Sequence, residues 1–333
     1  VRLTPAEEDS VSETRELPLV EAIKEAYRQE LERDESVFMV GQDIAGGIFP
    51  HTKGLVEQFG TDRIVDTPLA EIGMYGTAFG AAMEGYKPIV DFMFAGFFLN
   101  AASPILAQTA QFRFIHGSQM SLPIVITGAC GAGMRLGNEH AMLVHNMIAQ
   151  VPGIKVCMPS TPYDAKGLML AAIRDPNPVA FIWNLGTMMD RGPVPEEDYE
   201  IPLGLADVKR EGSDVTLVAN GFQYKNAEAV ADKLADDISV EIVDPRSISP
   251  LDIATILKSL EKTNRLVVVD ESWDSRSTAS QIAARVVDEG FDLLDAPIKR
   301  VTIPDIPLPG GHMEPYVAPN PDAIEAAVRA VCR

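Results

Sequence analysis

Apolar residues recur along this chain in two patterns, one typical of helices and one typical of buried strands. In residues 18–33 they fall at Val20, Ile23, Tyr27 and Leu31, a spacing that places them on one helical face. Residues 69–85, 102–114 and 164–174 are also predicted to be helical. Short apolar runs bounded by turn residues predict strands at 37–40, 64–65, 89–92, 123–126, 154–157 and 179–183. Such alternation of strands and helices predicts a mainly parallel sheet covered on both faces.

A second block of alternating elements follows a segment that has little periodicity. Residues 186–204 are rich in proline, glycine and acidic side chains, which is typical of a linker. Beyond it we predict strands at 215–219, 240–243, 266–269 and 298–303, and helices at 226–234, 253–260, 275–287 and 321–331. The chain is therefore predicted to be α/β, with two doubly wound domains at 17–190 and 205–333, a linker at 191–204 and a loose N-terminal arm at 1–16.

The composition of the chain argues against several classes of protein. The 333 residues carry a formal net charge of -20, which argues against unaided binding to nucleic acid or to an anionic membrane. The chain has no apolar run as long as the roughly 18 residues that a membrane helix needs. Its three cysteines, Cys130, Cys157 and Cys332, are far apart and lack metal-ligand spacing. We therefore expect reduced thiols and a cytoplasmic protein.

Few catalytic motifs are present in the sequence. GxSxG, HExxH and Walker A patterns are absent, and the glycine-rich stretch at 128–137 lacks the GxGxxG spacing of a nicotinamide site. The run Asp66-Thr67-Pro68-Leu69-Ala70-Glu71 places a carboxylate at the start of a predicted helix rich in small residues. Taken alone, Glu71 is explained as an acid that the helix dipole favours.

Glu71 does not stand alone, because the sequence around it resembles that of a known family. Residues 66–94 read DTPLAEIGMYGTAFGAAMEGYKPIVDFMF and precede the aromatic pair Phe97 and Phe98. They resemble the beta subunits of E1 components of 2-oxo acid dehydrogenases, which include the pyruvate, branched-chain and acetoin enzymes. The resemblance runs from about residue 17 to the C-terminus. It includes TKGLVEQFG at 52–60, HAMLVHNMIAQVPGIKVCMPSTPYDAKGLMLAAIRDPNP at 140–178, VDPRSISPLD at 243–252 and RVTIPDIPLP at 300–309.

This resemblance implies a pyrimidine-binding domain followed by a transketolase-type C-terminal domain, with thiamine diphosphate as cofactor. Glu71 matches the carboxyl that hydrogen-bonds the aminopyrimidine ring and promotes the tautomer that removes the thiazolium C2 proton. Phe97 matches the aromatic residue that stacks on the pyrimidine, although its aromatic neighbours also fit a place in the core. His140 matches an active-site histidine that lies near the substrate and can donate a proton.

Two further implications concern metal ions and partners. Ile124, Ala172, Asp175 and Asn177 match positions that hold a structural monovalent cation such as K⁺ in some relatives, and they equally fit a capped helix end and turn. The chain lacks the GDG segment that holds the diphosphate through Mg²⁺ in thiamine enzymes. The resemblance therefore implies an alpha-type subunit that carries GDG and Mg²⁺ in an α2β2 assembly. It also implies a small 2-oxo acid as substrate and a lipoyl acyltransferase (E2) as partner.

Several positions differ from the usual pattern of the family, namely Gln42, Ser103, Pro104, Glu139, Ala141 and Met142. They flank the expected reaction side, whereas Glu71 and Phe97 are retained. We interpret this pattern to mean that the chain keeps its part in cofactor binding. The pattern does not decide which substrate is used or which molecule accepts the transferred unit. One alternative is a split transketolase-like enzyme that transfers a two-carbon unit to an aldehyde. The other is a non-catalytic scaffold that dimerises and docks a carrier protein.

Overall fold

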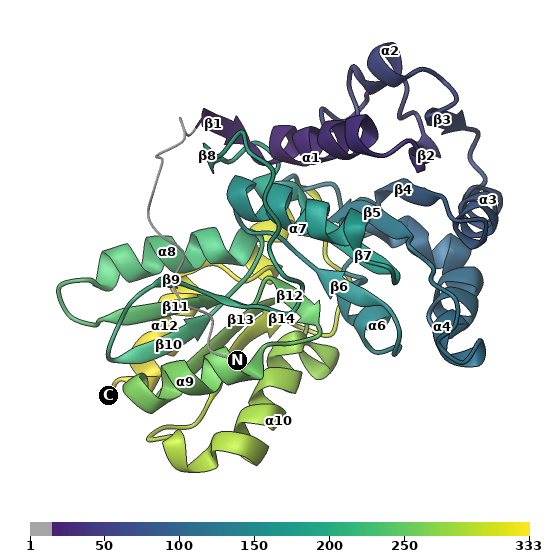
Figure 1. Cartoon of the computed structure of the whole chain (residues 1–333). Coiled ribbons are helices and arrows are strands. Elements are labelled where there is room, and N and C mark those ends of the chain that lie inside the picture. The colour runs from purple at the N-terminus through teal and green to yellow at the C-terminus, as the bar shows by residue number, and fades with distance from the viewer. Residues whose placement is uncertain (1–14) are drawn as a thin grey trace.

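Two mainly parallel sheets organise the chain, as predicted (Figure 1). The computed structural model describes residues 15–333. The first sheet has seven strands in the order β12-β6-β7-β5-β4-β2-β3, and only β12 is antiparallel to its neighbour. Its strands are β2 (Val37–Gln42), β3 (Ile64–Thr67), β4 (Lys87–Phe94), β5 (Val125–Cys130), β6 (Lys155–Cys157), β7 (Val179–Asn184) and β12 (Ser247–Ser249).

Helices flank this sheet where the apolar periodicity predicts them. The face of α1 (Leu19–Arg33) that carries Val20, Ile23, Tyr27 and Leu31 is buried, which confirms the expected amphipathic helix. α7 (Pro162–Arg174) begins at a proline and is capped by Thr161, whose side chain accepts a hydrogen bond from the Asp164 amide at 3.2 Å. The remaining α-helices of this domain are α2 (Leu55–Phe59), α3 (Glu71–Met83), α4 (Phe112–Ile115), α5 (Asn138–Ala141) and α6 (His145–Ala149).

The helix expected at 102–114 is interrupted, because the chain after β4 forms three shorter helical segments, the last two of which lie in this range. These are the 3₁₀-helix η1 (Ala95–Ala101), the π-helix η2 (Ser103–Thr109) and α4. Pro104 stands at the start of η2, where its missing amide and fixed φ interrupt the regular hydrogen-bond pattern. The tight turn of η1 determines which side chains face the functional site.

The second domain is doubly wound as predicted. Its sheet has the order β14-β13-β10-β11-β9, with only β9 antiparallel. One apolar cluster joins α8 and α12 to one face of this sheet, and a second cluster joins α9 and α10 to the other. The elements are β9 (Asp207–Arg210), β10 (Val215–Val218), α8 (Phe222–Leu234), β11 (Val240–Asp244), α9 (Ile253–Thr263), β13 (Leu266–Trp273), α10 (Thr278–Gly290), β14 (Lys299–Ile303), α11 (Glu314–Val317) and α12 (Pro321–Val331).

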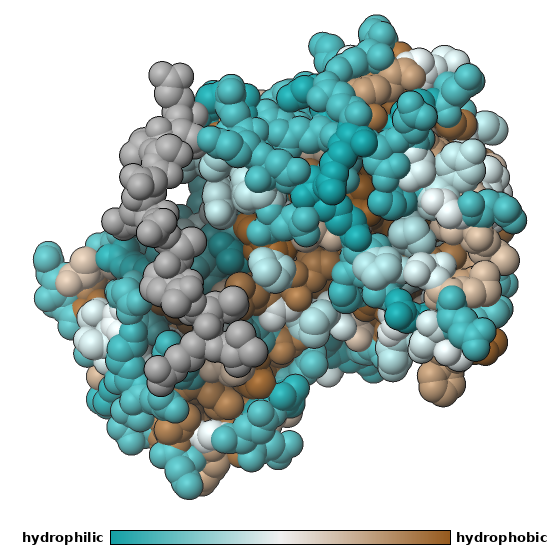
Figure 2. All heavy atoms as spheres, viewed as in Figure 1, coloured by the Kyte–Doolittle hydropathy of each residue, from teal (hydrophilic) through white to brown (hydrophobic). Residues whose placement is uncertain are grey.

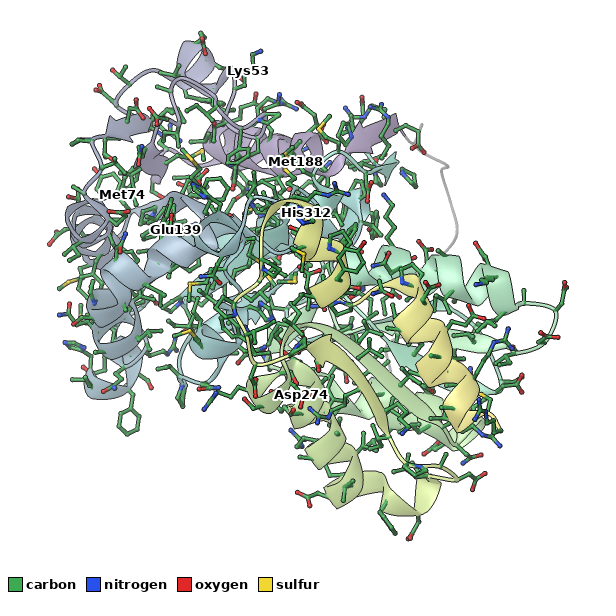
Figure 3. All side chains as sticks on the ribbon, turned by 180° about the vertical axis from the view of Figure 1, so that it is seen from behind. Lys53, Met74, Glu139, Met188, Asp274 and His312 are labelled. Carbon is green, nitrogen blue, oxygen red and sulfur yellow. The ribbon has the colours of Figure 1, made fainter. Side chains whose placement is uncertain are left out.

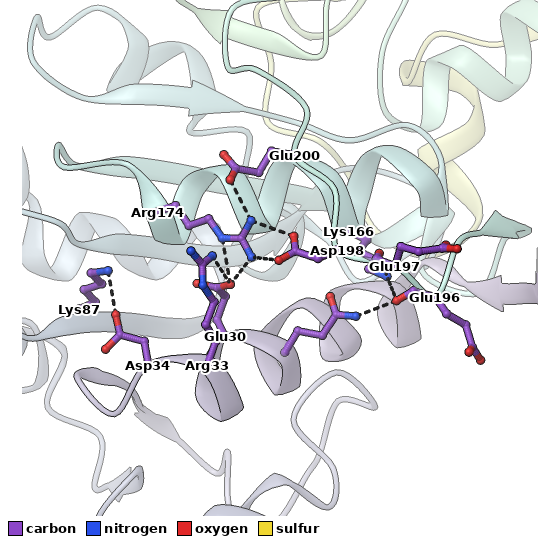
Figure 4. Close-up of polar contacts among 11 residues, drawn as sticks. Glu30, Arg33, Asp34, Lys87, Lys166, Arg174, Glu196, Glu197, Asp198 and Glu200 are labelled. Atoms are coloured by element: carbon purple, nitrogen blue, oxygen red, sulfur yellow. Dashed lines mark hydrogen bonds and ion pairs between the residues drawn. The ribbon is translucent and has the colours of Figure 1, made fainter. Parts of the chain in front are cut away.

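The segments predicted as an arm and a linker pair with each other. Residues 1–14 of the predicted arm lie outside the described residues. β1 (Arg15–Pro18) pairs antiparallel with β8 (Arg191–Val194), so a short ribbon ties the start of the linker to the first domain. Figure 4 shows Arg174 of α7 bridging Glu30 of α1 and two acidic residues of the same linker, Asp198 and Glu200.

The two domains share a strand and a buried ion network. After β11 the chain leaves the second sheet, and β12 extends the first sheet beside β6. Asp164 of α7 is fully buried and contacts Arg246 Nε at 2.8 Å and Lys209 Nζ at 2.8 Å, both from the second half of the chain. Within residues 15–333, no helix has both the length and the apolar character to cross a membrane. Figure 2 shows one largely hydrophilic face, interrupted by apolar surface near its centre.

Candidate active site

The candidate site lies at the edge of the first sheet where the parallel strands β3, β4 and β5 end; β4 and β5 are neighbours, and β2 lies between β4 and β3. β3 leads into α3, β4 into η1, and β5 into a glycine-rich loop and then α5. Ligand sites of open parallel sheets form at the carboxyl ends of the strands. The topology thus brings together Glu71 on α3, Phe97 on η1 and His140 on α5, which are the residues predicted from the sequence.

Glu71 is the first residue of α3 and is half-buried. Asn100 Nδ2 donates a hydrogen bond of 2.9 Å to Glu71 Oε1, the one side-chain partner that this carboxylate has among residues 15–333. Large apolar side chains flank it on the surface, since Leu69 is 71% and Ile72 64% exposed. The carboxylate therefore stands beside apolar surface that residues 15–333 leave uncovered.

Phe97 faces the site, whereas its neighbour Phe98 belongs to the core. Phe98 is almost fully buried and packs edge-on against Phe92, with ring centroids 4.8 Å apart. Phe97 is only half-buried and packs edge-on against Phe94 at 5.8 Å. Side chains three residues apart eclipse in a 3₁₀-helix, so Phe97 and Asn100 share one face of η1. η1 therefore presents an aromatic ring and the amide donor that contacts Glu71.

His140 packs against the same aromatic group. Its ring lies edge-on to Phe94, with centroids 4.6 Å apart, and 5.9 Å from the ring of Phe97. Gly96 permits this approach, because a β-carbon there would lie 2.9 Å from the carbonyl oxygen of Glu139. The packing of η1 against α5 thus brings His140 close to Phe97.

The four residues predicted to hold a monovalent cation lie around the C-terminus of α7. Asp175 is the C-cap residue, and its carboxylate pairs with Lys155 and accepts the Asn177 amide at 2.9 Å. The Ile124 carbonyl accepts a hydrogen bond from the Val179 amide at 3.0 Å, and Ala172 is buried. These contacts agree with a capped helix end, and the cation stays a prediction. Within residues 15–333, no group of three or more His, Cys, Asp or Glu is arranged to hold a metal.

Sequence reasoning missed one buried pair beneath the site. His51 Nε2 lies 2.7 Å from Asp91 Oδ2, and both side chains are almost fully buried. A signal was available, because Asp91 interrupts the apolar strand IVDFMF, and a buried carboxylate needs a partner. Burial, together with the negative charge of Asp91, raises the pKa of Tyr27 well above its usual value. Asn100 gave no comparable signal, since nothing in the sequence shows which way a 3₁₀ turn faces.

Comparison with known proteins gives the same division of the chain. Residues 15–187 match the family model of the transketolase pyrimidine binding domain, and residues 204–324 match that of the transketolase C-terminal domain. The fold resembles a solved split gene transketolase in an inactive beta4 tetramer, with a TM-score of 0.79 and 19% identity over 95% of this chain and 98% of that one. At that identity the likeness concerns the fold alone.

Curated relatives from Bacillus subtilis (strain 168) are much more similar in sequence. The beta subunit of acetoin:2,6-dichlorophenolindophenol oxidoreductase is 43% identical over 93% of this chain and 95% of its own. The beta subunit of the pyruvate dehydrogenase E1 component is 41% identical over 94% and 98%. The beta subunit of 2-oxoisovalerate dehydrogenase is 42% identical over 93% and 97%. The chain therefore belongs to the family of E1 beta subunits of the pyruvate, 2-oxoisovalerate and acetoin dehydrogenases.

Proposed function

We propose that this chain is the beta subunit of a heteromeric enzyme that uses thiamine diphosphate to decarboxylate a small 2-oxo acid. The acyl or hydroxyalkyl unit that results is transferred onward, and a lipoyl carrier is the acceptor we propose. The observation that carries the proposal is the grouping of Glu71, Phe97 and His140 at one edge of the first sheet. Family membership and these three side chains support the same chemistry.

The residues present fit the aminopyrimidine half of the cofactor. Glu71 offers a carboxylate whose Oε1 is oriented by Asn100, and Phe97 offers a half-buried ring for stacking. When bound, thiamine diphosphate supplies a carbon nucleophile and an electron sink for decarboxylation. Glu71 would exchange a proton with the ring nitrogen that it faces.

His140 is suited to the substrate side. Its ring is held by Phe94 and lies beside Phe97, so a substrate bound next to the stacked ring would be within its reach. An imidazole side chain can both donate and accept a proton. We assign it the protonation of the oxyanion that develops on the substrate carbonyl.

An alpha-type partner completes the site in this proposal. The chain has no GDG segment for the Mg²⁺-diphosphate, and exposed Leu69 and Ile72 leave the surface around Glu71 uncovered. A partner subunit seated there would exclude water from the carboxylate and supply the diphosphate site in an α2β2 assembly. Residues Ile124, Ala172, Asp175 and Asn177 remain the proposed monovalent cation site, and the lipoyl acyltransferase remains the proposed acyl acceptor.

The test is calorimetric titration of thiamine diphosphate with Mg²⁺ into this chain co-expressed with its alpha partner. Wild type, Glu71→Ala and Glu71→Gln are compared, and each is assayed with a panel of 2-oxo acids and with acetoin. We expect wild type to bind cofactor and turn over one of these substrates. Both variants should lose turnover, because neither can exchange a proton with the pyrimidine.

Other outcomes would favour the alternatives. If the complex binds cofactor but uses neither a 2-oxo acid nor acetoin, ketose donors with an aldehyde acceptor test the split transketolase-like reaction. Ala141 and Met142 beside His140 would then account for the change of substrate. If a correctly assembled complex binds no cofactor, the catalytic proposal is wrong and the scaffold alternative replaces it.

A further inference from the structure

The glycine-rich loop at 131–137 connects β5 to the helix that carries His140, and side chains of the second domain hold it. Glu271 of β13 is buried and accepts a hydrogen bond from the backbone amide of Ala132. Glu314, the first residue of α11, is also buried and accepts from the next amide, that of Gly133, at 2.8 Å. Two carboxylates from one domain therefore bind consecutive amides of a loop in the other.

The chain on the other side of His140 is held by the same strand. His145 is almost fully buried, and its Nε2 lies 3.6 Å from Oδ1 of Asp270, the neighbour of Glu271 in β13. Thr278 Oγ1 donates to Asn146 Oδ1 at 2.5 Å. In Figure 3 the segment that carries His312 crosses from the second domain toward the first. The His140 segment is thus attached to the second domain on both sides.

The loop is closely fitted to Glu271. Gly131 has a φ of +84°, and a β-carbon on it would collide with Asn184 and Glu271. Asn184 Nδ2 and Gln223 Nε2 also donate to the Glu271 carboxylate, at 3.2 and 2.6 Å. A buried carboxylate is costly unless it is hydrogen-bonded, so these donors and the loop amide keep it in place.

We propose that Glu271 is a positioning residue for His140, acting through the loop that it anchors, with Glu314 in support. Glu271 contacts neither Glu71 nor Phe97 in the structure, so the effect passes through the backbone of 131–137. When the loop is anchored, α5 keeps the His140 ring against Phe94. The docking of the second domain thereby sets the geometry of the reaction side. This inference rests on the proposed function, in which His140 protonates the substrate.

The chain contains its own reporter of loop position. Cys130 is fully buried immediately before the loop, and Cys157 is fully buried in β6, which is separated from β5 by β7 in the same sheet. If the loop opens, a thiol reagent reaches Cys130 and not Cys157. Loss of the Glu271 acceptor should raise the labelling rate of Cys130 by about tenfold, which corresponds to roughly 1.4 kcal/mol of local opening free energy.

The experiment compares wild type, Glu271→Ala, Glu271→Gln and Glu314→Ala, each co-expressed with the alpha partner. Labelling of each cysteine is followed by mass spectrometry, and thiamine diphosphate binding and kcat are measured beside it. Glu271→Ala should expose Cys130 and lower kcat while cofactor affinity stays within about twofold. Glu271→Gln, which keeps one acceptor oxygen, should recover part of both effects. Glu241→Ala is the matched control, because Glu241 is an equally buried acid of the second domain on β11.

Three results would overturn the inference. Cys130 could stay as protected in Glu271→Ala as in wild type. Cys130 and Cys157 could be labelled at the same raised rate, which would make Glu271 a support of the whole fold. The Glu241→Ala control could reproduce the effect. The labelling of Cys130 can be measured without enzyme turnover. It therefore tests the anchoring of the loop by Glu271 separately from the proposed function. A complex that shows the labelling change but binds no cofactor contradicts the proposed function and leaves the loop anchor intact.

Discussion

Asn100 Nδ2 and Glu71 Oε1 lie 2.9 Å apart and join η1 to the first turn of α3. The bond fixes the position of one carboxylate oxygen of Glu71. We predict that Asn100→Ala weakens cofactor binding or turnover by about 10- to 100-fold, since a hydrogen bond to a charged group contributes about 1.5–3 kcal/mol. Calorimetry and steady-state kinetics on the assembled complex measure this. The exposed Gln108 on η2 provides a control, and Gln108→Ala should change neither quantity.

The variant Asn100→Asp tests the electrostatic part of this relationship. It replaces the amide donor with a second carboxylate next to Glu71, and two close carboxylates cannot both ionise readily. We therefore expect the acidic limb of the kcat/KM profile to move to higher pH. A profile that superimposes on that of wild type would show that the Asn100 contact has no influence on the protonation of Glu71.

Phe97 and Phe98 are adjacent but should respond differently to truncation. Phe98→Ala removes a buried ring and should cost about 3–5 kcal/mol of the free energy of unfolding. Phe97→Ala should leave the melting temperature nearly unchanged and weaken cofactor binding by about 2- to 12-fold, as expected for loss of an aromatic pair of about 0.5–1.5 kcal/mol. Thermal unfolding and calorimetry on both variants distinguish the roles. Equal losses of stability would place Phe97 in the core instead.

The sequence predicts those features that are set by residues close together along the chain, and it does not predict contacts between distant segments. Apolar periodicity placed α1, the parallel strands of both sheets and four helices of the second domain, α8, α9, α10 and α12, because burial of one face depends on spacing. It did not find the antiparallel strands β1, β8, β9 and β12, which are short. It missed the interruption within 102–114, where Pro104 stands at the start of the π-helix η2 and α4 follows as a separate short helix. Resemblance to the family motifs predicted Glu71, Phe97 and His140 as site residues, and their roles stay predictions. The contacts of Glu271 with the glycine-rich loop span 139 residues and depend on domain packing, which no local pattern encodes.

Asp244 should make stability depend on pH near neutrality. Its carboxyl is fully buried at the end of β11, and burial, aided by the charge of Asp164, raises its pKa to about 7. A raised folded-state pKa means that the folded chain binds the proton more tightly. The stabilisation that this proton gives to the folded state is fully present below the unfolded-state pKa of about 3.9. It is lost as the pH rises through the folded-state pKa of about 7.

The measurement is thermal unfolding of wild type and Asp244→Asn across pH 5 to 8. The asparagine variant cannot ionise, so the melting temperature of wild type should fall relative to that of the variant as pH rises. Each kcal/mol of the free energy of unfolding corresponds to roughly 2–4 °C in melting temperature for a domain of this size. A constant difference between the two curves would mean that Asp244 does not titrate in this range.

Lys166 provides the sharpest test of how the linker is held. Its side chain is fully buried, and Nζ lies 2.7 Å from Glu25 Oε1 and 2.6 Å from the carbonyl oxygen of Pro195. Lys166→Met leaves these acceptors without their donor, so we predict a loss of about 3–5 kcal/mol, or roughly 6–20 °C in melting temperature. Lys225→Met is the control, because the Lys225 ion pair with Asp190 is solvent-exposed and should contribute less than about 1 kcal/mol. Similar small shifts in both variants would show that the buried ammonium does not hold the linker.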